Sequence, residues 1–202
     1  MNGRNVDSDD LALDFLNTRR YVKGRATDLI STPDRLLEWL DRVGFHTEGI
    51  DTELSPPAAR LLFDEARRLR GGIRTAVEAH VLGEPMPPSS LYGLNRALDV
   101  SRVTTQLIHD GEKMTLLERD TAPASLAALS RIALTAARLL TDVDRRRIRQ
   151  CRSDRCVLWF LDTSKSGRRR WCSMATCGNR AKAARHYQKQ KTPDQELRSG
   201  LP

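Results

Sequence analysis

The spacing of the cysteines constrains this chain more than any other feature. All four lie after residue 150 of the 202 residues, where Cys151, Cys156, Cys172 and Cys177 form the pattern C-x4-C-x15-C-x4-C. Each short spacer lets the chain fold back so that two sulfurs reach one metal ion, about 2.3 Å from each sulfur. Two disulfides or four unliganded thiols are the alternatives. Disulfides suit exported proteins, and the polar start MNGRNVDSDD lacks a signal-peptide core. We therefore predict one zinc ion.

This zinc is predicted to be structural. Four thiolates leave no open position for water or substrate, which a catalytic zinc normally keeps. His186 is an alternative ligand, although four cysteines already complete the site. The front of the chain carries no cysteine and no phosphate-cradling glycine loop. We therefore predict that the protein is not an enzyme.

The residues between the second and third cysteines favour a β-hairpin. The run 157–161 predicts a first strand, 162–167 a turn and 168–171 a returning strand, and the alanines after Cys177 favour a helix. A metal knuckle, a hairpin and a helix around one zinc make a treble-clef-like finger. Trp159, Phe160 and Trp171 are interpreted as the small core beneath the zinc, with stacking on nucleic-acid bases as the alternative.

The charge of the chain is divided unevenly. Residues 145–202 contain 16 Lys and Arg against 4 Asp and Glu, whereas residues 1–144 contain 18 against 22. A basic excess around a small zinc unit is typical of a surface that binds a polyanion, and a helix held by zinc can enter the major groove of DNA. The predicted DNA contacts are Arg168, Arg169, Arg170, Asn179, Arg180, Lys182, Arg185, His186 and Lys189. An RNA-binding finger is the alternative.

The front of the chain predicts a mainly α-helical domain with one β-hairpin, so the fold class is α+β. Thr32 and Pro33 mark one helix start, and a second helix begins near Ser55-Pro56, with Gly71-Gly72 either dividing or kinking it. Further helices are expected at about 90–100 and after Pro123. Asp110-Gly111 predicts a two-residue hairpin turn within 103–119. The expected divisions are a sensor or dimerisation domain (1–144), a zinc finger (145–190) and a flexible tail (191–202).

Two motifs resemble known families. CGNR at residues 177–180, inside WCSMATCGNRAKAARH and preceded by WFLDTSKSGRRRWC, resembles the CGNR zinc-finger proteins, bacterial transcription regulators found mostly in actinobacteria. LALDFLNTRR at residues 11–20, with STPDRLLEWL, resembles the ABATE domain, described as a stress-induced transcription regulator. The resemblance implies DNA-binding regulation, with the four cysteines at the metal positions.

The role of the front domain is left open by its sequence. Asn17, Arg19 and Trp39 are candidates for binding a small-molecule effector, against the plainer interpretation of a helix cap, a solvated charge and a core residue. The domain alternatively pairs two fingers in a homodimer. No stretch is apolar enough for a membrane span. We therefore expect a cytoplasmic, nucleoid-associated protein that binds double-stranded DNA.

Overall fold

The computed structural model describes residues 10–22, 25–45, 55–100, 103–109, 111–120 and 122–196. Most of the described chain is helical, and its strands occur in short antiparallel pairs, which confirms the predicted fold class. The helices are α1 (Leu11–Leu16), α2 (Pro33–Arg42), α4 (Pro56–Leu82), α5 (Pro88–Asp99), α6 (Ala124–Asp142) and α7 (Asn179–Glu196). The paired strands are β1 (Arg19–Val22) with β2 (Arg25–Asp28), β3 (Val103–His109) with β4 (Met114–Asp120), and β5 (Ile148–Gln150) with β6 (Trp159–Leu161).

The helix boundaries follow local capping chemistry. The hydroxyl of Thr32 accepts the backbone N–H of Arg35 at 3.3 Å, Pro33 occupies the first helical position, and Gly44 follows α2 with φ 90°. Helix α4 is one unbroken helix of 27 residues, so Gly71-Gly72 does not divide it. It ends at Gly83, which has φ 74° and lies against the Arg145 guanidinium, so a side chain there has neither the backbone conformation nor the space it needs.

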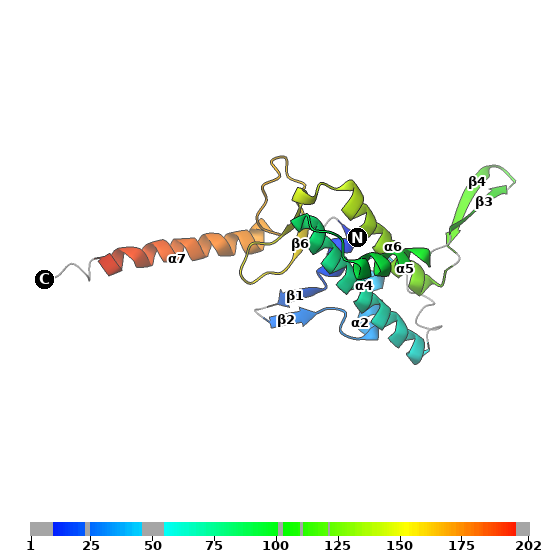
Figure 1. Cartoon of the computed structure of the whole chain (residues 1–202), viewed down its shortest axis with the longest axis horizontal. Helices are drawn as coiled ribbons and strands as arrows, with labels where there is room; N and C mark the ends of the chain where they lie inside the picture. Colours follow the sequence, from blue (N-terminus) through cyan, green and yellow to red (C-terminus); the bar gives the residue numbers. More distant parts are fainter. Residues whose placement is uncertain are drawn as a thin grey trace.

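The core of the front part lies where α1, α4, α5 and α6 meet (Figure 1). The short helix α1 is buried along most of its length between α4 and α6. Helix α6 contributes a continuous apolar face, as its spacing predicts, through Ala128, Leu129, Ile132, Ala133, Ala136 and Leu139. Within the described ranges, no helix combines the length and apolar character needed to cross a bilayer.

Two elements extend from this body in opposite directions (Figure 1). One is the β3–β4 hairpin, in which His109 pairs with Met114. Four residues therefore connect the strands, and the predicted two-residue turn is wrong, although Asp110 itself lies outside the described residues. The other is α7, which continues to Glu196 and so covers the first six residues of the segment predicted as a tail.

The C-terminal strand pairing differs from the prediction. Strand β6 pairs with β5, which precedes the first cysteine, and not with residues 168–171, which form no strand. The chain between Cys151 and Cys156 reverses direction, and this reversal brings the segments on either side of it together. Trp159 and Ile148 of this hairpin join the core of the front helices, so Trp159 does not belong to the small core beneath the metal site.

Candidate zinc centre and nucleic-acid interface

The four cysteine sulfurs converge at one point. Cys151 directly follows β5, and Cys156 lies at the end of the chain reversal between β5 and β6. Cys172 lies in the loop after β6. Cys177 lies in the π turn η2 (Met174–Gly178), which precedes α7. All four sulfurs are within 4.8 Å of one another. The Cys156–Cys172 and Cys172–Cys177 sulfur pairs are each 3.7 Å apart. A tetrahedron with zinc–sulfur bonds of 2.3 Å has edges of about 3.8 Å. No disulfide joins these cysteines.

The protonation of the thiols also fits a metal site. The hydrogen bond with Cys172 lowers the pKa of Cys156 to about 5. The same hydrogen bond, with burial and the neighbouring thiolates, raises the pKa of Cys172. Burial raises the pKa of Cys151. The raised pKa values of Cys151 and Cys172 disfavour their thiolates in the absence of a cation, and a bound divalent cation stabilises sulfur ligands in the deprotonated form. The cluster is the site of one structural zinc ion.

A buried carboxylate organises the loop that carries the third ligand. Asp162 is fully buried and accepts hydrogen bonds from the backbone N–H groups of Ser164 (3.1 Å) and Arg169 (2.7 Å). Burial raises the pKa of Asp162, but the hydrogen bond from the Ser164 hydroxyl, the two backbone N–H groups and the nearby Arg149 together outweigh it and hold the pKa below its usual value. Arg147 donates to the carbonyl oxygens of Asp162 and Ser164 at 2.8 and 3.2 Å. The loop is therefore fixed from both sides.

The Asn17 side chain forms a buried polar contact between the front helices and the zinc unit, beside the apolar packing of Ile148 and Trp159. Asn17, which ends α1, is buried and donates its amide N–H to the Trp159 carbonyl at 2.8 Å. Its amide oxygen accepts the Trp159 backbone N–H at 2.9 Å. The Asn17 amide thereby satisfies both backbone polar groups of Trp159, as a neighbouring β-strand would. This contact links positions 142 residues apart.

Two family models match the sequence, and together they span most of it. The model described as "ABATE: Putative stress-induced transcription regulator" matches residues 9–143, and the "CGNR zinc finger" model matches residues 147–190. The chain belongs to the ABATE family. The resemblance recognised in LALDFLNTRR and CGNR is thereby confirmed. No curated protein matches the sequence.

The CGNR motif of this ABATE-family chain has a distinct use for each residue. Cys177 belongs to the four-cysteine zinc site. Gly178 is buried, and an added Cβ there meets the Met174 side chain and the Trp171 ring. Asn179 begins α7 and donates its amide N–H to the Ala175 carbonyl at 3.2 Å. Arg180 is exposed. The first three residues therefore fix the start of α7 on the zinc unit, and the fourth faces solvent.

The predicted DNA-contact residues fall into three groups. Most of them are exposed: Arg168, Arg170, Asn179, Arg180, Lys182, Arg185 and His186. Arg169 is half-buried, lies over the Phe160 ring at 4.8 Å and donates to the carbonyl oxygens of Trp171 and Cys172, so it supports the zinc loop. The backbone of Lys189 is helical, and its side chain lies outside the described part of the chain.

The surface of α7 carries two differently placed sets of polar residues. Lys182, Arg185 and His186 lie within about 100° of one another around the helix axis, because one residue advances about 100°. Arg180 lies two residues before Lys182 and so on nearly the opposite side. Ala184 on the same helix is also exposed. Among the side chains that the structure describes, Lys182, Arg185 and His186 therefore form a basic stripe, which the helical position of Lys189 continues, and Arg180 is separate from it.

The structure gives the three residues considered for effector binding different surroundings. Trp39 is buried in the core, where its ring lies 5.3 Å from that of Phe15. Asn17 is also buried, and its amide is occupied by Trp159. Arg19 is exposed on β1 and lines a cavity.

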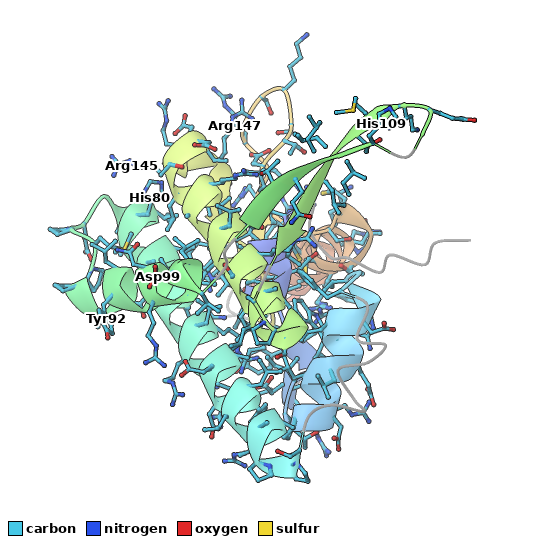
Figure 2. The ribbon with its side chains drawn as sticks, turned by 90° about the vertical axis from the view of Figure 1, so that its right-hand side faces the viewer. His80, Tyr92, Asp99, His109, Arg145 and Arg147 are labelled. Atoms are coloured by element: carbon cyan, nitrogen blue, oxygen red, sulfur yellow. The ribbon has the colours of Figure 1, made fainter. Side chains whose placement is uncertain are left out.

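His80, at the end of α4, and His109, on the projecting hairpin, are far apart (Figure 2).

Several organising residues have only weak sequence signals. Arg70 is buried on α4, where it binds Asp28 and Thr18, although its neighbours in sequence suggest an ordinary charged helix face. Asp162 has a better signal, because it is one of only two acidic residues in 145–193 and directly follows an apolar run. An isolated acid after a strand, within an otherwise basic segment, indicates an internal partner for arginines.

Proposed function

We propose that this protein is a DNA-binding transcription regulator, in which one structural zinc ion fixes the start of a basic helix that binds the major groove of double-stranded DNA. The observation that carries the proposal is the exposure of α7. Its side chains from Lys182 to Gln188 are all exposed, and the helix extends away from the body (Figure 1). An isolated helix with no apolar face is marginal in water, so an extended basic helix is suited to a partner that supplies contacts.

The size and charge of α7 support duplex DNA as that partner. Its 18 residues make a rod about 27 Å long, and the B-DNA major groove, about 12 Å wide, accommodates an α-helix. Lys182 and Arg185 supply phosphate contacts, while Asn179 and Arg180 are the residue types that recognise adenine and guanine edges. On the neighbouring loop, Arg168 and Arg170 are exposed and extend the basic surface.

The front part supports a second element of the proposal, a homodimer. One face of the β3–β4 hairpin carries exposed Leu107, Met114 and Leu116, with exposed fractions of 64%, 56% and 63%. A projecting hairpin with such a face is suited to pairing with a second copy of the chain. A twofold dimer presents two α7 helices to a palindromic site. We propose regulation, rather than catalysis, in the cytoplasm at the nucleoid, with a small-molecule effector acting on the front part.

Fragments selected from a genomic DNA library provide the test. The full-length zinc-loaded protein is expected to enrich duplexes with a common sequence. Arg185→Ala is expected to weaken binding and to reduce the slope of log affinity against log salt by about 1, with zinc content unchanged. Arg138→Ala is the matched control, because it removes an exposed arginine from α6. Tighter, sequence-selective binding of structured RNA, or equal effects of the two substitutions, contradicts the proposal.

A further inference from the structure

Two adjoining cavities lie between the β1–β2 hairpin and α4. The first has a volume of about 390 Å³ and is lined by five arginines and two aspartates. The second, of about 400 Å³, extends along the hairpin to Tyr21 and to Val157 of the zinc unit. Arg19, Asp28 and Arg74 line both cavities. Each volume is within the usual range for small-molecule sites.

The wall between the hairpin and the helix is held by an ion pair between buried Arg70 and half-buried Asp28. Arg70 is 5% exposed and donates to both carboxylate oxygens of Asp28, at 2.7 and 2.6 Å, and to the Thr18 hydroxyl at 2.6 Å. This two-point contact fixes β2 against α4. Arg70 is therefore committed to the structure, and the negative charge of Asp28 is already neutralised.

The remaining arginines of the first cavity are left with excess positive charge. Over the described residues, neither Arg19 nor Arg67 forms an ion pair, and Arg74 is 3.8 Å from its partner Glu78. Burial lowers the pKa of Arg74 below the usual arginine value; Glu78 opposes this shift, and the charges of Arg19 and Arg70 add to it. Arg74 also donates to the Leu16 carbonyl at 3.3 Å, and Arg67 lies over the Phe63 ring at 5.5 Å, so neither guanidinium has a close carboxylate partner in the part of the chain that the structure describes. An anion beside Arg19, Arg67 and Arg74 supplies the negative charge that these groups lack.

This local charge contrasts with the rest of the front part. Residues 1–144 have four more acidic than basic side chains, so an arginine cluster there is not part of a general basic surface. Asp28 and Asp64 also line the first cavity, which disfavours the continuous phosphate backbone of DNA. A small anion reaches the arginines without approaching a long acidic surface.

We infer that these cavities bind a small molecule bearing at least two oxyanion groups, phosphate or carboxylate, held by Arg19, Arg67 and Arg74. The uncharged part of such a ligand lies against Tyr21 and Val157. This inference identifies the chemical class of the effector and so rests on the proposed regulatory function.

The position of the site explains how the ligand acts on the finger. Val157 lies next to Cys156 in sequence and two residues before Trp159, whose backbone is held by Asn17. Asn17 and Thr18 immediately precede Arg19, and Thr18 accepts the hydrogen bond from Arg70. A ligand between α4 and the hairpin therefore contacts both sides of the joint between the front part and the zinc unit. Binding is expected to change DNA affinity.

Isothermal titration of the full-length zinc-loaded protein with inorganic pyrophosphate and with citrate, in phosphate-free buffer, tests the inference. We expect saturable binding of at least one probe. Arg19→Ala and Arg74→Ala are each expected to weaken it about ten- to a hundredfold, the usual effect of losing a hydrogen bond to a charged group. Arg138→Ala, a matched loss of one exposed arginine, is expected to bind like the original protein. Circular dichroism and zinc content confirm that each variant is folded.

Several outcomes overturn the inference. Failure of both probes to bind excludes the site, and equal weakening by Arg138→Ala reduces it to general charge attraction. If Arg19→Ala lowers duplex affinity in the absence of any probe, the cluster is a DNA contact instead. The two proposals fail separately: DNA binding without probe binding removes only this inference, whereas probe binding without DNA binding removes only the proposed function.

Discussion

The contact between Asn17 and Trp159 provides a quantitative test of how the zinc unit is joined to the front part. Asn17→Ala removes hydrogen bonds of 2.8 and 2.9 Å and leaves one backbone N–H and one carbonyl of a buried residue without partners. Each unsatisfied buried group costs about 1–3 kcal/mol, and the lost side chain adds a small void. We expect the free energy of unfolding to fall by about 3–5 kcal/mol, a large part of the typical total of about 5–15 kcal/mol.

Equilibrium urea unfolding followed by circular dichroism, with zinc present in both states, measures this change. Asn95→Ala is the matched control, because Asn95 is exposed on α5, and its effect is expected to stay within about 0.5 kcal/mol. The midpoint should shift for Asn17→Ala while the dependence on urea concentration stays similar. A loss of less than about 1 kcal/mol relative to the control refutes the assigned role of Asn17.

Two further predictions concern the zinc ligands and the ion pair between Arg70 and Asp28. Cys172→Ser is expected to abolish zinc binding and to unfold the zinc unit while the front helices persist. Metal content and circular dichroism measure both effects, and Ser166→Ala, at an exposed position, is the control. A folded, zinc-loaded Cys172→Ser variant contradicts the four-ligand site. The pKa of Asp28 is below its ordinary value, because the hydrogen bond and charge of Arg70 outweigh burial. The ionised carboxylate of Asp28 therefore stabilises the folded protein above about pH 4. This contribution is lost as the pH falls through the pKa of Asp28 in the folded protein. Between about pH 5 and 3, the original protein should therefore lose more stability than Asp28→Asn. Acid releases zinc from both proteins, so the comparison between them removes that effect. Equal losses contradict the stabilising role of the Asp28 carboxylate.

The sequence predicts those features that depend on nearby residues. The helix start at Thr32 and Pro33 depends on local capping, and the structure confirms it. The cysteine pattern is also nearly local, because each spacer brings two sulfurs together and only one loop separates the pairs. Short-range chemistry therefore indicates the metal site and several helix boundaries.

Features that depend on distant partners have no comparable signal. The partner of Asn17 is 142 residues away, and that of Arg70 is 42 residues away. The arginines at 168–170 resemble an exposed strand, yet the backbone of Arg169 binds buried Asp162 and its side chain turns toward the zinc loop. The pairing of β6 with β5 was missed because the chain reversal between the first two cysteines was interpreted as a metal knuckle alone, without the strands that flank it.

Reversible removal of the metal shows whether one zinc ion positions a basic helix on duplex DNA. We measure zinc per chain and the affinity for a selected duplex before chelation, after chelation and after zinc is restored. The account predicts one zinc per chain, loss of selective duplex binding with the metal, and recovery on its return. Equal binding by the metal-free protein, or no duplex binding by the zinc-loaded protein at low salt, contradicts it.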